Sequence, residues 1–313
     1  IMQEIYAPKH SSVADTLNNL GNVHSDLGEY AQSLTYYREA LGIMQEVYGP
    51  KHPSVADTLN NLGAVHSDLG EPAQSLTYLR AALGIKKEVY GPKHPTVAAT
   101  LNNLGAVYDE LGDYQKSIAH YTKALEIMRE VYGFKHPSIA KTLIGLGNAY
   151  SDSGDHKKSQ ECYTQALSIR KEVSGDRAST LYKLGNLCKV SGEYVQSIQY
   201  YKECLGVQSK LYGAIHANVA TTLTDLGNIH SALGEYTSSV MYYEEALEIR
   251  RQVYDGIHPL LARTLHDLGN AHMGLGNRTK SLTYYGAALQ MYQLLGPIIN
   301  QDSFAFLGIS RPL

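Results

Sequence analysis

Histidine is the residue type in this chain whose number and spacing most suggest chemistry. Histidine binds metal ions and transfers protons near neutral pH, and the chain contains 13 of them. Six share one sequence context, most of them 42 residues apart. These six are His10, His52, His94, His136, His216 and His258. A zinc ion needs its ligands about 2 Å away, which side chains in separate copies of a repeated unit cannot all reach. The pattern therefore predicts a capping or corner role rather than a metal or catalytic site.

Cysteine and the common catalytic motifs suggest no alternative site. Cys162, Cys188 and Cys204 form an odd and unevenly spaced set, so we expect small buried apolar side chains in a reducing compartment. The sequence has neither a glycine-rich phosphate loop nor a Gly-x-Ser-x-Gly motif. It therefore predicts no metal site, no cofactor and no enzymatic activity.

The elements that must position these residues follow a repeat that runs along the chain. A Leu-Gly pair marks each copy, and the pairs are Leu20-Gly21, Leu62-Gly63, Leu104-Gly105, Leu146-Gly147, Leu184-Gly185, Leu226-Gly227 and Leu268-Gly269. Their spacing is 42 residues, except for 38 residues between the fourth and fifth pairs. A fixed period of this length is typical of a solenoid.

Each copy contains two helical patterns. In the copy that begins at His52, apolar residues recur in steps of three and four until Gly70, which suits a helix end. A second pattern begins at Pro72 and stops at Gly91. The sequence thus predicts an all-α array of helix pairs. Four second helices contain interior glycines, which indicate either close helix approach or simple tolerance; they are Gly42, Gly84, Gly206 and Gly286.

With these features, the sequence resembles the tetratricopeptide repeat. Its signature pairs an aromatic-x2-Leu-Gly-x2-Tyr pattern with an alanine and aromatic pattern in the second helix. The matching positions in the first copy are Leu17, Leu20, Gly21, His24, Ser33, Tyr37 and Ala40. The longer unit and the Tyr-Gly-Pro-Lys-His-Pro run at 48–53 resemble the kinesin light chain and nephrocystin type. The resemblance implies a right-handed α-solenoid superhelix of antiparallel helix pairs.

The period also predicts the domain organisation. The predicted repeats are 10–51, 52–93, 94–135, 136–175, 176–215, 216–257 and 258–296. Residues 1–9 copy the end of a second helix, so we expect the array to continue before Ile1. Residues 297–313 lose the register, and we expect an irregular, poorly ordered tail there.

Composition limits the partners of the array. The net charge is −3 and no basic block is present, which argues against nucleic acid as a partner. No apolar run reaches the length of a membrane span, so no membrane insertion is expected. We expect a cytoplasmic chain whose partner is a protein or peptide.

The resemblance places the first helices along the concave groove, where asparagine is unusually frequent. Eight asparagines lie two residues before or after the leucine of the Leu-Gly pairs, although asparagine is a poor helix former. A carboxamide donates and accepts hydrogen bonds at once, which suits peptide contact; a ladder between neighbouring helices is the alternative, and both could hold. The candidate peptide-binding residues are Asn18, Asn22, Asp26, Asn60, Asp68, Asn102, Asp109, Asn148, Asn186, Lys189, Asn228 and Arg263.

Charge on the same face divides the array. The first three repeats place acidic residues there without lysine or arginine, and later repeats add Lys141, Lys189 and Arg263. We expect an acidic groove near the N-terminus that prefers basic segments. The predicted function is a non-catalytic protein-interaction scaffold. The alternatives are a sensor or regulatory arm of a larger nucleotide-binding signalling protein, and a cargo adaptor similar to kinesin light chain.

Overall fold

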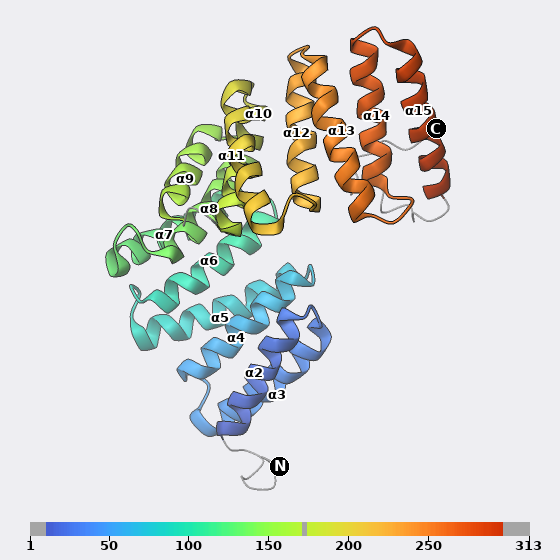
Figure 1. Cartoon of the computed structure of the whole chain (residues 1–313). Helices are drawn as coiled ribbons and strands as arrows, with labels where there is room; N and C mark the ends of the chain where they lie inside the picture. Colours follow the sequence, from blue (N-terminus) through green and yellow to red (C-terminus); the bar gives the residue numbers. More distant parts are fainter. Residues whose placement is uncertain (1–10, 171–173, 297–313) are drawn as a thin grey trace. The chain divides into compact units, whose positions relative to one another are not determined.

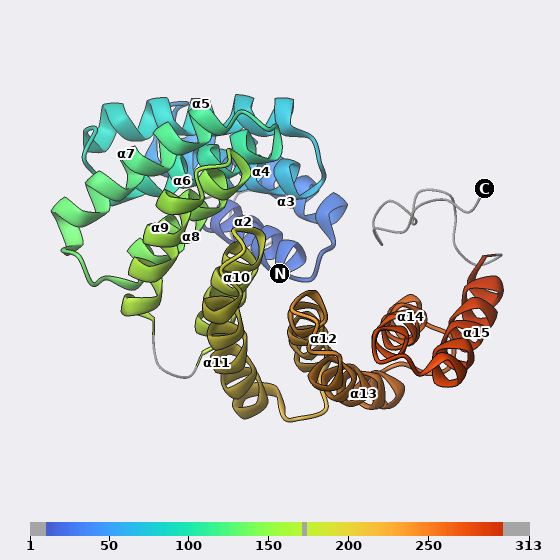
Figure 2. The same cartoon turned by 90° about the horizontal axis from the view of Figure 1, so that it is seen from above.

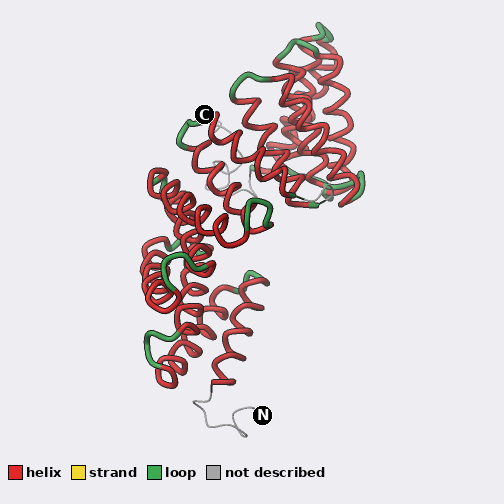
Figure 3. The backbone as a smooth tube through the Cα atoms, turned by 90° about the vertical axis from the view of Figure 1, so that its left-hand side faces the viewer, coloured by secondary structure: helices red, strands yellow, loops and turns green. Residues whose placement is uncertain are grey.

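The computed structural model describes residues 11–170 and 174–296, which form 14 helices and no strand (Figures 1 and 3). The first helices of the pairs are α2 Ser11–Asp26, α4 Pro53–Asp68, α6 Pro95–Glu110, α8 Pro137–Asp152, α10 Gly175–Val190, α12 Ala217–Ala232 and α14 Pro259–Gly274. The second helices are α3 Tyr30–Tyr48, α5 Pro72–Tyr90, α7 Tyr114–Tyr132, α9 His156–Ile169, α11 Tyr194–Tyr212, α13 Tyr236–Val253 and α15 Arg278–Leu295. This arrangement confirms the predicted all-α solenoid of helix pairs. The predicted helix end at 1–9 and the predicted tail at 297–313 lie outside the described residues.

The chain divides into two compact units. Unit 1, residues 1–169, contains four helix pairs, and unit 2, residues 170–313, contains three. The division falls beside the connection that is four residues shorter than the others. None of the helices in the described part combines the length and the apolar character that a membrane span requires.

The glycine of each Leu-Gly pair lets the two helices of a repeat approach closely. A methyl group added to Gly227 would lie 2.5 Å from Cε1 of Tyr243, and one added to Gly63 would lie 2.6 Å from Cγ of Leu79. The other five glycines of the set likewise face the ring of their own second helix. In five repeats a second-helix serine adds a hydrogen bond to the glycine carbonyl, as Ser33 does to Gly21 at 2.8 Å. The repeat signature is therefore the contact between the two helices of a pair.

Clusters of buried apolar residues join neighbouring repeats within each unit. In unit 1, Leu101, Met128, Ile139 and Leu143 belong to a cluster that joins α6, α7 and α8. Consecutive first helices also contact one another: α2 with α4, α4 with α6, and α6 with α8. Figure 2 shows α5 and α7 along one side of unit 1, with α4 and α6 next to them. The layer of first helices is therefore the more closely spaced one, as expected for the concave side of a solenoid.

The recurring histidines begin the first helices. The Nδ1 atom of His52 accepts a hydrogen bond from the backbone N–H of Ser54 at 3.3 Å, and its ring stacks on Tyr48 at 4.2 Å between centroids. The same cap and stack recur at His94, His136, His216 and His258. An N-cap acceptor satisfies a backbone N–H of the first turn that has no partner inside the helix. The predicted corner role is thus confirmed for these five, and His10 lies outside the described residues.

The cap at His258 makes the stability of unit 2 depend on pH. Burial, with a smaller effect of the Arg250 guanidinium, lowers the pKa of His258. The unfolded chain therefore takes up this proton first as the pH falls below about 6.5, and stability is lost in that range. We expect His258→Asn, which keeps a cap acceptor that does not titrate, to show a smaller fall in melting temperature between about pH 7 and pH 5.5. His272, whose pKa burial also lowers, retains part of the slope; equal slopes in parent and variant would contradict the assignment.

The interior glycines of the second helices face open space. A methyl group added to Gly42, Gly84, Gly206 or Gly286 meets nothing within 4 Å. Close helix approach is therefore wrong as the reason for these four glycines. Tolerance at open positions accounts for them, because burial between repeats supplies the stability that each glycine forgoes.

Candidate functional site

The asparagines before the Leu-Gly pairs link successive first helices of unit 1. The Oγ1 atom of Thr58 donates to Oδ1 of Asn18 at 3.2 Å, and Thr100 donates to Asn60 in the same way at 3.1 Å. In the next repeat, Nδ2 of Asn102 donates to Oγ1 of Thr142 at 2.9 Å. These three asparagines are half-buried. The ladder between neighbouring helices is therefore present, and each side chain keeps part of its surface in contact with solvent.

The asparagines after the Leu-Gly pairs each hold a tyrosine of their own repeat. In each of five repeats, a second-helix tyrosine donates its hydroxyl hydrogen to the asparagine Oδ1 at 2.6 or 2.7 Å. These asparagines are Asn22, Asn148, Asn186, Asn228 and Asn270. Burial raises the pKa of Tyr37, Tyr163, Tyr201 and Tyr243, so these hydroxyls remain protonated donors. These asparagines therefore fix the tyrosine ring that packs on the glycine of the Leu-Gly pair.

Repeat 2 lacks this pair, and a hollow lies there on the first helices. Ala64 and Leu79 occupy the positions of the asparagine and the tyrosine. Together with residues of α6 they line a pocket of about 130 Å³ between α4 and α6. Leu79 and Val107 are buried, and Ala64 and Ala106 are half-buried, so the floor is apolar. Sequence reasoning missed this pocket, although the joint change at 64 and 79 was its visible signal.

Acidic side chains mark the carboxyl ends of all four first helices of unit 1. Asp26, Asp68, Glu110 and Asp152 are the last residues of α2, α4, α6 and α8, and all four are exposed. The equivalent residues of unit 2 are Val190, Ala232 and Gly274. An acidic group at a helix C-terminus opposes the helix dipole, so this row has an unfavourable local energy. Asp109 lies beside it, half-buried.

The predicted basic residues of unit 2 have a different setting. Nζ of Lys189 lies 2.8 Å from Oδ1 of Asp225, whose Oδ2 accepts a hydrogen bond from the Tyr182 hydroxyl at 2.7 Å. Lys189 is therefore neutralised by a neighbouring repeat. Arg263 is exposed and lines a pocket of about 180 Å³ together with Asp225 and Asn228. The structure thus brings Lys189 and Arg263 to the same region of unit 2, around Asp225.

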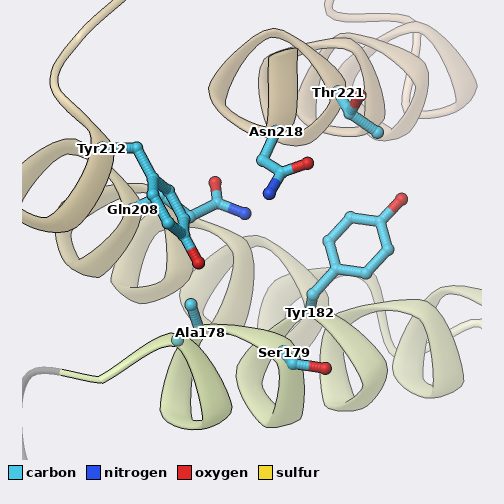
Figure 4. Close-up of a pocket in the computed structure, with 8 residues that line it drawn as sticks. Ala178, Ser179, Tyr182, Gln208, Tyr212, Asn218 and Thr221 are labelled. Atoms are coloured by element: carbon cyan, nitrogen blue, oxygen red, sulfur yellow. The ribbon is translucent and has the colours of Figure 1, made fainter. Parts of the chain in front are cut away.

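A second hollow of unit 2 has a neutral polar lining. It measures about 220 Å³ and lies between α10, the end of α11 and the start of α12. Figure 4 shows Tyr182, Gln208, Tyr212 and Asn218 around it. Hydroxyl and amide groups of this kind can hydrogen-bond an uncharged polar group, such as a peptide backbone.

Metal and thiol chemistry find little support in the geometry. Among residues 11–170 and 174–296, no group of three or more His, Cys, Asp or Glu side chains is placed to hold a metal ion. The three cysteines are free and buried, as predicted. Burial raises the pKa of each thiol, that of Cys162, Cys188 and Cys204 alike, to about 11. At neutral pH these thiols are therefore not nucleophilic thiolates.

The repeat pattern has a counterpart in a known family model. The tetratricopeptide repeat model matches residues 12–88, 55–130, 96–172, 176–252 and 220–294. Together these matches include almost the whole chain. No protein of curated function matches the sequence.

Solved structures share the fold at low sequence identity. BtubC (BKLC) from P. vanneervenii is 21% identical with a TM-score of 0.62, over 74% of this chain and 92% of that one. A putative kinesin light chain from Podosopora anserina is 17% identical with a TM-score of 0.59, over 66% and 99% of the two chains. A STAND protein from Pyrococcus horikoshii, PH0952, is 14% identical with a TM-score of 0.75, over 90% of this chain and 42% of that one. These similarities confirm the architecture.

Proposed function

The chain belongs to the tetratricopeptide repeat family, and from this premise we propose that it is a protein-interaction scaffold. Its partner is an extended polypeptide segment that lies along the first helices. The scaffold is non-catalytic and cytoplasmic, and the binding residues are those predicted on the first helices, centred in unit 1.

One observation carries this proposal: the linking asparagines use only part of their hydrogen-bonding capacity. Oδ1 of Asn18 and Oδ1 of Asn60 are held by the threonine of the next repeat. Both side chains are half-exposed, and within residues 11–170 their Nδ2 groups have no protein acceptor. A side chain that is already fixed loses little entropy when it binds a ligand. The first helices of unit 1 therefore present preorganised donors, which a peptide backbone carbonyl can accept.

A selection from a displayed peptide library on the whole chain tests the proposal. We expect the selected peptides to bind Asn18→Ala/Asn60→Ala at least tenfold more weakly, because two fixed donors are lost. Each change also removes a hydrogen bond between repeats, at a cost of about 1 kcal/mol, so melting curves must show that the variant stays folded. Binding is measured by fluorescence anisotropy.

The matched control changes the second helix of repeat 2, which is the repeat that contains Asn60. Gln74 and Thr77 are exposed on α5, and Gln74→Ala/Thr77→Ala should leave the affinity unchanged. Loss of binding in this variant, with full binding by the asparagine variant, would move the site to the second helices and overturn the proposal.

A sensor arm of a larger signalling protein is the second candidate. It is favoured by the match over 90% of this chain to a protein described as having a tetratricopeptide repeat sensor, of which the chain covers 42%. Under this proposal a nucleotide-binding domain with a phosphate-binding loop is encoded before Ile1. Determining that coding sequence tests it, and a different kind of domain there would favour the cargo-adaptor alternative.

A further inference from the structure

The pocket between α4 and α6 lies where unit 1 departs from the usual residues of the repeat. In the five repeats that have both members, the asparagine and tyrosine pair fills this position of the first-helix surface. In repeat 2, Ala64 is smaller than the usual asparagine and Leu79 is smaller than the usual tyrosine. In repeat 3, Ala106 stands where five other repeats have asparagine. The shortened side chains leave an apolar floor formed by Ala64, Leu79, Ala106 and Val107.

Polar groups surround this floor on one side. Asp68 and Glu110 line the pocket together with Ser67 and Asn103. The Ser67 hydroxyl donates to Oε2 of Glu110 at 2.8 Å, and Nδ2 of Asn103 donates to Oδ1 of Asn60 at 3.3 Å. Within residues 11–170, neither Asp68 nor Glu110 forms an ion pair with lysine or arginine. Partial burial raises the pKa of Asp68, so a cation beside it would stabilise its ionised form.

The pocket therefore has an apolar floor beside two acidic groups, which suits a long side chain with an apolar stem and a cationic end. Lysine and arginine carry a long apolar stem that packs on apolar surface while the charged end remains in a polar environment. We propose that this pocket binds a lysine or arginine side chain of a basic partner segment, with the stem on Ala64, Leu79 and Ala106 and the cation between Asp68 and Glu110. This inference rests on the proposed function, since it names the partner chemistry of the same surface.

The acidic row sets the spacing of further basic residues in the partner. Asp26, Asp68, Glu110 and Asp152 end successive first helices, and helices in contact lie about 8–10 Å apart. A polyproline II segment has three residues per turn and advances about 9 Å per turn, so every third side chain points the same way. In a fully extended strand, residues three apart point to opposite sides. The partner segment is thus a polyproline II stretch with lysine or arginine at every third position.

A synthetic peptide tests this inference directly. The probe is a proline-rich peptide with four basic residues at every third position, and its affinity for the whole chain is measured by calorimetry at two salt concentrations. We expect binding that weakens with salt, because charged pairs at the surface are screened. Peptides with the basic residues placed consecutively, or with glutamate in their place, should bind at least tenfold more weakly.

Two variants separate the pocket from the charge. Ala64→Asn/Leu79→Tyr rebuilds the pair found in five other repeats, so it should fill the pocket, keep the fold and weaken the probe at least tenfold. Asp68→Asn/Glu110→Gln should weaken the probe and reduce its salt dependence. Glu88→Gln/Glu130→Gln makes the same charge change on second helices, where these residues pair with Lys51 and Lys93, and should leave affinity unchanged.

The outcomes distinguish this inference from the proposed function. Full binding of the probe by a folded Ala64→Asn/Leu79→Tyr variant, or equal binding of the glutamate peptide, overturns the pocket assignment. If library peptides still depend on Asn18 and Asn60 in that case, the scaffold function stands and only the partner chemistry fails. If neither the probe nor the library peptides depend on the first helices, both fail.

Discussion

Replacing Gly227 with alanine should lower the free energy of unfolding by about 2–3 kcal/mol, because the added methyl group overpacks a closed contact. The new carbon would lie 2.5 Å from Cε1 and 2.7 Å from Cδ1 of Tyr243. That ring is buried, and its hydroxyl is fixed on Asn228 at 2.7 Å, so it cannot turn aside without losing this bond. Urea denaturation of the whole chain, followed by helicity, measures the effect.

Gly206 in the same unit provides the matched control. It also lies inside a helix, but a methyl group added there meets nothing within 4 Å. Gly206→Ala should therefore raise stability by about 1 kcal/mol, the difference in helix propensity between the two residues. Opposite signs for the two substitutions are the expected result, and a loss of similar size in both would show that contact with Tyr243 is not the cause.

Replacing Arg250 with methionine should stabilise unit 2 by about 1–3 kcal/mol. The Arg250 side chain is 3% exposed, and burial lowers the pKa of its guanidinium. Its Nη1 atom contacts the Thr264 hydroxyl and the Leu260 carbonyl, yet within residues 174–296 no carboxylate pairs with it. A buried charge without an opposite charge retains much of its desolvation cost, and apolar replacements of similar volume often increase stability.

The repeat itself indicates that methionine fits at this position. Met44 and Met128 occupy the equivalent positions in repeats 1 and 3, where each sulfur lies 3.3 or 3.4 Å from the hydroxyl oxygen of the threonine of the next repeat. Lys86→Met is the comparison, because Nζ of Lys86 lies 2.9 Å from Oδ1 of Asp57 and its charge is already compensated. Thermal melting should show a larger gain for Arg250→Met, and a loss of stability in that variant would refute the argument.

The fold could be predicted from the sequence because the repeat period alone identifies an array of helix pairs. The Leu-Gly spacing located every helix pair, and the histidine and proline run located where most first helices begin. The sequence left two explanations open for the second-helix glycines, since a glycine in a close contact and one facing open space cannot be distinguished in a sequence. Only the Cβ environment separates Gly227 from Gly206.

The candidate surface was harder to predict because an asparagine amide can serve several partners. The same residue type links repeats at Asn60 and holds a tyrosine hydroxyl at Asn186, and only the geometry distinguishes the two. The pocket arises because Ala64, Leu79 and Ala106 are smaller than the residues at the same positions in other repeats. A search of the sequence for reactive or charged groups does not detect such positions. Asp26 and Asp68 were predicted individually, whereas the row of acidic residues at four helix ends appeared only with the helix bounds.

The bond between threonine and asparagine that joins repeats has a consequence for the evolution of chain length. Thr58 meets Asn18 in the same way as Thr100 meets Asn60, so the junctions are interchangeable. Deleting one 42-residue copy would bring Thr100 against Asn18 and recreate a junction that already exists. Unequal recombination within the gene can therefore add or remove whole repeats, without requiring any compensating mutation at the new junction between repeats.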